Sequence, residues 1–162
     1  MQNRSTTKTP SLSPLKKVLV IGNGGRENSL AWALGKSKTI EKIFVAPGNG
    51  GTENHPKCHC IEVSANQREL LFSLCFKESI NLVVIGPEAP LAEGLANDLR
   101  DKGITVFGPC SKGANLEASK KWAKQLMQDA CVPTAKYWAA NNQDEAYKIL
   151  RSIKEPLVVK AD

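Results

Sequence analysis

The fold of this chain is decided by residues 17–27, which read Lys17-Val18-Leu19-Val20-Ile21-Gly22-Asn23-Gly24-Gly25-Arg26-Glu27. The four aliphatic residues before the glycines form a short apolar run, which is typical of a strand buried on both faces. The glycines allow a sharp turn and a close approach of other groups, because they have no Cβ. A helical pattern follows from Arg26. Strand, glycine turn and helix begin a βαβ unit, whose turn directs backbone N–H groups and a helix dipole at one place and so attracts an anion.

The turn differs from two nucleotide-binding motifs. A dinucleotide fingerprint needs a third glycine where this chain has Glu27, and an acidic residue after the second strand, where this chain has residues 46–49, Ala-Pro-Gly-Asn. A P-loop is excluded because no Gly-Lys-Ser/Thr follows the turn. An NAD-binding oxidoreductase is therefore disfavoured. Arg26 favours a phosphate, because a guanidinium binds anions through paired hydrogen bonds; a tight turn without a ligand stays the alternative.

Length and charge exclude further classes. A chain of 162 residues can bury one core and part of a second unit. No apolar run approaches the roughly 18 residues that a membrane helix requires. The net charge of +6 lies mostly in residues 1–17, which hold four basic residues and no acid; the remainder holds 18 basic and 16 acidic residues. Since no nucleic-acid-binding motif accompanies this charge, we expect neither nucleic acid nor membrane as a partner.

The first residues and the cysteines indicate the compartment. Residues 1–16 are rich in Ser, Thr and Pro without periodicity, which predicts a disordered tail. An organelle transit peptide is less favoured, because the tail is short and lacks an amphipathic face. Five scattered cysteines indicate reduced thiols in the cytoplasm. The cluster His55, Cys58, His59 and Cys60 has no second ligand pair at zinc spacing, so we predict no metal site there.

Strands alternate with helical patterns over the first two thirds of the chain. This order predicts an α/β fold, a mostly parallel sheet with helices on both faces. Ligands of such sheets bind beyond the carboxyl ends of the strands. We therefore expect the three loops that leave carboxyl ends to line one crevice. In the third loop, a single acid between prolines, Glu88, suits hydrogen bonding to sugar hydroxyls or an amine; an exposed turn residue is the alternative. The loops span residues 22–27, 46–52 and 86–91.

Beyond Pro109 the pattern predicts helices at residues 119–130 and 146–153, with a short strand near Tyr137 and Trp138. The apolar run at residues 156–160 predicts a strand so near the end of the chain that a second domain is expected to be cut short. The predicted domains are a tail, an α/β domain, and a linker helix with the truncated start of a further domain. They span residues 1–16, 17–117 and 118–162.

Several short segments, in order and at approximate spacing, together resemble the glycinamide ribonucleotide synthetase family of the ATP-grasp superfamily. The resemblance covers nearly all of residues 17–162. It implies a Rossmann-like pre-ATP-grasp domain followed by the truncated start of an ATP-grasp domain. The segments are Val18–Glu27, Val45–Asn49, Gly86–Leu91, Phe107–Pro109, Ser119–Lys120 and Val158–Asp162.

The resemblance implies a ligase of de novo purine biosynthesis. Family members join glycine to 5-phosphoribosylamine, converting ATP to ADP and phosphate and producing glycinamide ribonucleotide. The small-molecule partners are then 5-phosphoribosylamine, glycine and ATP, with Mg²⁺ or Mn²⁺ as the metal, while the oligomeric state stays open. The family's metal ligands lie beyond the segment present here, so we expect this chain to be inactive by itself. A stand-alone ribose-phosphate or nucleotide-binding module is the alternative.

The resemblance also assigns residues. It assigns no catalytic residue and no metal ligand. The family usually has a histidine after Arg-Glu, where this chain has Asn28, which cannot titrate. Lys120 and Lys160 resemble the lysines that contact ATP before and within the lid. The residues that resemble the ribose-phosphate side are Gly24, Gly25, Arg26, Glu27, Asn49, Gly50, Pro87 and Glu88.

Overall fold

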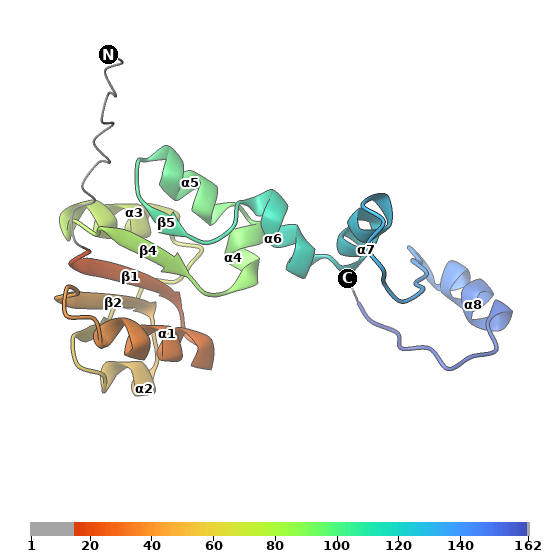
Figure 1. The fold of residues 1–162 in the computed structure, drawn as a ribbon, viewed down its shortest axis with the longest axis horizontal. Helices are drawn as coiled ribbons and strands as arrows, with labels where there is room; N and C mark the ends of the chain where they lie inside the picture. Colours follow the sequence, from red (N-terminus) through yellow and green to blue (C-terminus); the bar gives the residue numbers. More distant parts are fainter. Residues whose placement is uncertain (1–14, 162) are drawn as a thin grey trace, which may run out of the picture. The chain divides into compact units, whose positions relative to one another are not determined.

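A computed structural model describes residues 15–161 in two compact units (Figure 1). The first unit ends at Gly86 and also includes Asp98–Gly108, whereas the second comprises Pro87–Asn97 and the residues from Pro109 onward. All but the last two residues of the predicted disordered tail lie outside the described part. The boundaries of these units do not coincide with the predicted domain boundary after residue 117. That domain boundary stays a prediction.

The first unit is built on a five-stranded sheet in which every pair of neighbours is parallel. The strand order is β3-β2-β1-β4-β5, which places the first strand in the centre (Figure 1). This confirms the predicted parallel α/β architecture. The strands are β1 (Lys17–Gly22), β2 (Lys42–Pro47), β3 (Cys58–Cys60), β4 (Leu82–Ile85) and β5 (Val106–Phe107).

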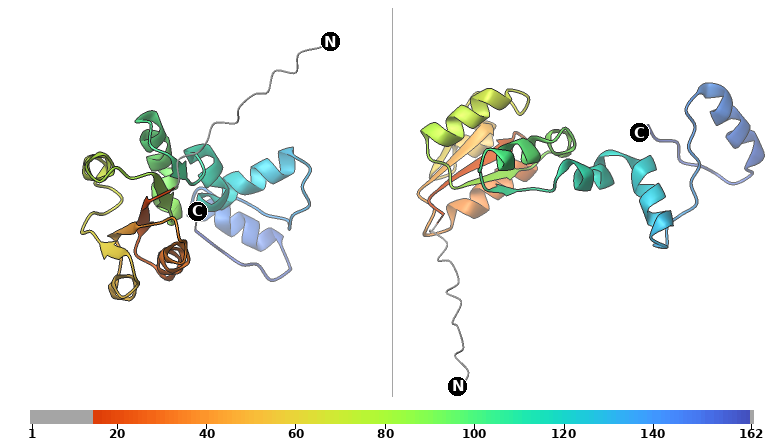
Figure 2. Two further views of the ribbon diagram at one scale, coloured as in Figure 1. Left: turned by 60° about the vertical axis from the view of Figure 1, so that its left-hand side comes forward. Right: turned by 90° about the horizontal axis from the view of Figure 1, so that it is seen from above.

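Helices cover both faces of this sheet. Figure 2 shows α1 (Gly25–Gly35) and α2 (Gly50–Glu53) on one face and α3 (Arg68–Lys77) on the other. The reason is that parallel strands are joined by right-handed crossovers, and the chain adds strands first on one side of β1 and then on the other. The connections therefore change faces between β3 and β4. Arg68 of α3 pairs with Asp98, which belongs to α5 (Leu95–Asp101).

The burial of β1 on both faces agrees with its central place in the sheet. Val18, Leu19, Val20 and Ile21 have no exposed surface. Since successive side chains of a strand point to opposite faces, four buried residues in a row require a cover on both sides. On the α1 face, buried Val18 and Val20 pack in one cluster with Ala31.

The second unit is helical. Ser119 accepts the backbone N–H of Trp122 at 3.1 Å at the start of α7, and Asn142 accepts that of Glu145 at 2.9 Å at the start of α8. These two helices confirm the helices predicted at residues 119–130 and 146–153, although α8 has no buried residue. The helices are α4 (Glu88–Ala92), α6 (Ser111–Ala118), α7 (Lys120–Asp129) and α8 (Gln143–Ser152); α5 begins in this unit and ends in the first.

Two predicted strands are corrected by the structure. Residues 156–160 and the pair Tyr137 and Trp138 are irregular. A strand is stable only when a neighbour pairs with its backbone. Val158 is 83% exposed, and the described residues offer it no such neighbour. Apolar β-branched residues indicate that a segment suits a strand, but they do not supply the partner.

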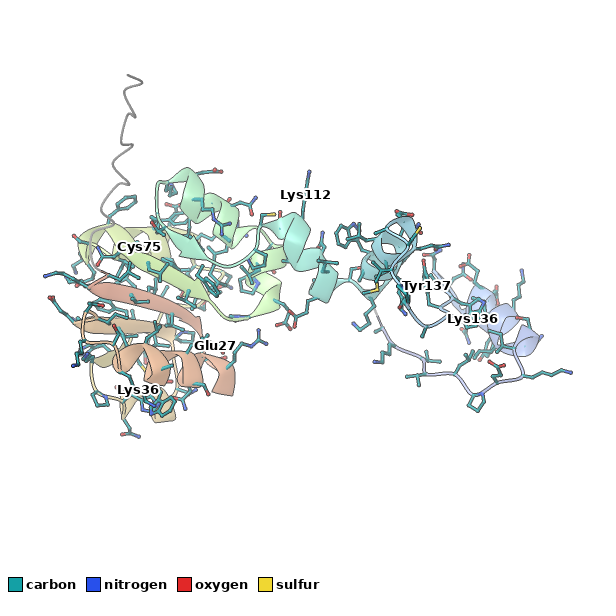
Figure 3. All side chains as sticks on the ribbon, in the orientation of Figure 1. Glu27, Lys36, Cys75, Lys112, Lys136 and Tyr137 are labelled. Carbon is teal, nitrogen blue, oxygen red and sulfur yellow. The ribbon has the colours of Figure 1, made fainter. Side chains whose placement is uncertain are left out.

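Cys75 of α3 gives a test of this core. Its side chain is buried in the first unit (Figure 3), and burial raises the pKa of its thiol to about 11. Because the thiolate is the reactive form, we expect iodoacetamide at pH 8 to label the exposed Cys110 and Cys131 of the folded protein but not Cys75. Mass spectrometry of the labelled peptides measures this, and unfolding in urea should remove the protection. Rapid labelling of Cys75 in the folded protein would contradict the described packing.

The raised pKa of the Cys75 thiol should also make the stability of the first unit depend on pH. Above its ordinary pKa of 9.0 the thiol of the unfolded chain loses its proton, whereas the folded chain keeps the proton until about pH 11. The unfolded state therefore binds fewer protons, and the contribution of Cys75 to the free energy of unfolding falls as pH rises through this window. We expect the difference in unfolding free energy between wild type and Cys75→Ala to shrink from pH 8 to pH 11. A constant difference would argue against a buried, protonated thiol.

Candidate functional site at the centre of the sheet

The carboxyl ends of β1 and β4 meet at the centre of the sheet. Ile21 pairs with Ile85, and the N–H of Gly86 donates to the carbonyl of Ile21 at 3.1 Å. From β1 the chain continues toward β2, whereas from β4 it continues toward β5 on the other side. Open α/β sheets bind their ligands at such a switch point. The glycine turn at residues 22–27 therefore lies where a ligand is expected.

Glu27 places a carboxylate at this point (Figure 3). The residue is 4% exposed, and its Oε2 accepts the backbone N–H of Gly24 at 2.7 Å. A Cβ on Gly22 would lie 2.5 Å from Cγ of Glu27, and a Cβ on Gly86 would overlap the carboxylate. Glycines thus leave the space that Glu27 fills. Gly86 lies in the third loop expected from the sequence, residues 86–91, but the sequence assigns no role to Gly86 itself.

Arg26 supplies positive charge beside this buried carboxylate. Its side chain is about half exposed, and Nη1 donates to the carbonyl of Gly86 at 2.5 Å. The N-cap of α1 is Gly24, which has no side chain to accept the N–H groups of the first turn. The positive end of the helix dipole and a guanidinium therefore lie together. This combination suits a bound anion such as a phosphate.

Asn49 ties the second loop to the glycine turn. Its side-chain oxygen accepts the N–H groups of Gly51 at 2.9 Å and Thr52 at 3.0 Å, which caps α2. Its side-chain nitrogen donates to the carbonyl of Asn23 at 2.8 Å. The structure thus brings together the loops at residues 22–27 and 46–52. Gly50 follows Asn49 as the first residue of α2.

A second polar contact lies just beyond these two loops. Nε2 of His55 lies 2.9 Å from Oδ1 of Asn28 on α1. His55, from the segment after α2, thus brings an imidazole to Asn28, the position at which the resemblance implies that the family usually has a histidine. The sequence reasoning missed this pair, because residues 27 positions apart in an α/β chain meet only through the register of β1 and β2.

The other predicted site residues lie in the second unit. Pro87 is the N-cap of α4 and Glu88 its first residue, so their place beside the glycine turn stays a prediction. Lys120 begins α7, while Lys160 lies in the irregular segment after α8. The structure describes no contact between these two lysines. An open depression of about 580 Å³ in this unit is lined by residues of α7 and the segment after it, among them Lys121, Trp122 and Tyr137.

The described residues do not form a metal site or a membrane segment. Within residues 15–161 no group of three or more His, Cys, Asp or Glu side chains could hold a metal ion. Cys58 is buried and His59 is exposed, and burial raises the pKa of the Cys58 and Cys60 thiols. None of the helices in this range is long and apolar enough to cross a membrane.

Two family models match the chain. The model of the phosphoribosylglycinamide synthetase N domain matches residues 16–117, and that of the phosphoribosylglycinamide synthetase ATP-grasp (A) domain matches residues 118–162. Phosphoribosylamine–glycine ligase of Neisseria meningitidis serogroup B is 47% identical over 146 residues, which are 90% of this chain and 34% of that protein. The ligase of Clostridium acetobutylicum is 42% identical over 90% of this chain and 35% of its own length. The chain thus spans about a third of these relatives.

Solved structures agree on the fold. Phosphoribosylamine–glycine ligase from Thermotoga maritima is 25% identical, with a TM-score of 0.58 over 85% of this chain and 31% of that one. The biotin carboxylase domain of a thermophilic 2-oxoglutarate carboxylase, bound to bicarbonate, is 24% identical, with a TM-score of 0.61 over 92% of this chain and 36% of its own. The second likeness shows a shared fold alone.

The effects of substitutions at Gly86 and Glu27 on the free energy of unfolding should be coupled. We expect Gly86→Ala to lower the free energy of unfolding by about 2 kcal/mol, because its Cβ overlaps the Glu27 carboxylate. In a Glu27→Ala background the overlap disappears, so the same change should cost at least about 1 kcal/mol less. Urea denaturation of the four variants measures the coupling. Gly25→Ala is the control, since a Cβ there meets nothing within 4 Å. Additive effects of the two changes would contradict the described contact.

Proposed function

Because this chain belongs to the phosphoribosylglycinamide synthetase family, we propose that it forms the ribose-phosphate side of a phosphoribosylamine–glycine ligase. The proposed reaction joins glycine to 5-phosphoribosylamine and converts ATP to ADP and phosphate. The observation that supports it most is the match of the N-domain model over residues 16–117, the segment that contains the glycine turn and Arg26.

The proposed chemistry explains why such a turn is needed. ATP phosphorylates the carboxylate of glycine, the amine of 5-phosphoribosylamine attacks the resulting acyl phosphate, and phosphate leaves. The attack requires the amine to be held in a fixed position, and the 5-phosphate is the strongest feature by which a protein can hold this substrate. Backbone N–H groups at the start of α1 and the guanidinium of Arg26 suit that phosphate.

The proposed substrate side comprises two groups of residues. In the first unit they are Gly24, Gly25, Arg26 and Glu27 of the turn with Asn49 and Gly50 of the second loop. Pro87 and Glu88 of the second unit would meet the ribose or the amine. Lys120 and Lys160 are the proposed contacts to ATP. We also propose that the protein acts in the cytoplasm on small molecules, with neither nucleic acid nor membrane as a partner.

Removal of the Arg26 charge tests the phosphate site. Isothermal titration calorimetry with ribose 5-phosphate should show binding to the wild-type chain, and Arg26→Ala should weaken it at least roughly tenfold, since a charge-assisted hydrogen bond is lost. Lys36→Ala is the matched control, because Lys36 carries the same charge just after the last residue of α1 and lies over the Trp32 ring. Equal losses in both variants would indicate a nonspecific charge effect, and equal affinity of wild type and Arg26→Ala would contradict the assignment.

A ligase assay separates the two candidate functions. A stand-alone ribose-phosphate or nucleotide-binding module is favoured by one observation, that the turn and second loop are held together within the first unit alone. Our expectation that the 162-residue chain has no ligase activity by itself remains a prediction. With ATP, glycine and 5-phosphoribosylamine we expect no release of phosphate from this chain, and steady turnover would refute it. A longer chain that continues into the rest of the ATP-grasp domain should be active if the ligase proposal is right.

A further inference from the structure

One peptide group of the glycine turn is held at both ends by side chains. The carbonyl of Asn23 accepts a hydrogen bond from Nδ2 of Asn49 at 2.8 Å, and the N–H of Gly24 donates to Oε2 of Glu27 at 2.7 Å. These two atoms belong to the same peptide unit. Because a trans peptide is planar and its C=O and N–H point in opposite directions, the two side chains fix one plane from opposite sides.

The amide of Asn49 is fully used within the protein. Its oxygen accepts from the N–H groups of Gly51 and Thr52 and from the Thr52 hydroxyl at 3.1 Å. Its nitrogen donates to the carbonyls of Asn23 and, at 3.5 Å, Gly24. An asparagine amide offers two donors and two lone pairs. A ligand could hydrogen-bond to this amide only by displacing contacts that the structure already makes.

The carbonyls of the two neighbouring peptide groups also point toward the second loop. The N–H of Gly48 donates to the carbonyl of Gly22 at 3.1 Å. Three successive carbonyls, those of Gly22, Asn23 and Gly24, are therefore bonded to residues 48 and 49. The peptide N–H groups that follow each carbonyl must point away from that loop. In this way the second loop sets the direction in which the start of α1 presents its N–H groups.

On the basis of the proposed function, we propose that Asn49 is a positioning residue of the ribose-phosphate site. Its side chain does not contact the phosphate; it holds the Asn23–Gly24 peptide against Glu27, so that the N-terminus of α1 and Arg26 face the ligand in a fixed arrangement. Fixed donors bind an anion more tightly than mobile ones, because no ordering is needed when the anion arrives.

Asn49→Ser is the variant that isolates this role. A serine at an N-cap still accepts N–H groups of the first helical turn, so α2 keeps its cap. Its hydroxyl is too short to reach the carbonyl of Asn23, and no charge is added near the phosphate. Asn54→Ser is the matched control: Asn54 lies at the other end of α2, and its side chain donates only to Gly50 at 2.8 Å among the contacts described.

Two readouts are measured on the full chain by NMR, namely hydrogen exchange of the Gly24 amide and a titration with ribose 5-phosphate. For Asn49→Ser we expect faster exchange of the Gly24 amide and about five- to tenfold weaker binding, the effect of one neutral hydrogen bond. Asn54→Ser should match the wild type in both. If the serine variant does not fold, Asn49→Thr provides the same test, because its hydroxyl can cap α2, cannot reach the carbonyl of Asn23 and adds no charge near the phosphate.

The outcomes separate this inference from the proposed function. Wild-type affinity in Asn49→Ser, whatever its stability, would overturn the positioning role while leaving the phosphate site in place. Weaker binding with unchanged exchange of the Gly24 amide would also overturn it, since Asn49 would then act by another route. No binding of ribose 5-phosphate by the wild-type chain would overturn the proposed function and the positioning role together.

Discussion

The first unit depends on one buried interaction, the Glu27 carboxylate that accepts the N–H of Gly24. Glu27 is buried, and a buried carboxylate is stable only when hydrogen bonds replace its lost hydration. Glu27 finds a backbone donor in the turn, and Gly22 and Gly86 leave space for it because neither has a Cβ. One side chain of α1 thereby joins the ends of β1 and β4.

From this contact the rest of the site follows in order. The register of β1 and β2 places Gly22 opposite Pro47, so the second loop begins beside the turn. Asn49 then holds the turn from the side opposite Glu27. Arg26, next to Glu27 in the chain, reaches the carbonyl of Gly86. The sheet therefore supplies the positions, and three polar side chains convert a flexible glycine turn into a fixed one.

The sequence was sufficient for the sheet but not for the directions of the side chains. The apolar run at residues 18–21 predicts a strand buried on both faces, and the alternation of elements predicts a mostly parallel sheet; both predictions are confirmed. The pattern places the loops that contain Glu27 and Asn49 near a ligand, and the resemblance assigns these two residues to it. Neither shows that both side chains turn inward onto one peptide group. The sequence also does not show why Gly86 must be glycine, because that need arises only from the place of the Glu27 side chain. The apolar run at residues 156–160 fails as a predicted strand for the same kind of reason, since pairing depends on a partner that local sequence does not reveal.

The central claim is that a turn clamped by Glu27 and Asn49 forms the phosphate site. A crystal structure of the chain with ribose 5-phosphate tests it most directly. We expect the phosphate at the N-terminus of α1 beside Arg26, with the Glu27 carboxylate still on the N–H of Gly24 and the Asn49 amide still on the carbonyl of Asn23. A phosphate bound elsewhere, or a Glu27 side chain turned away from Gly24 to meet the ligand, would contradict the claim.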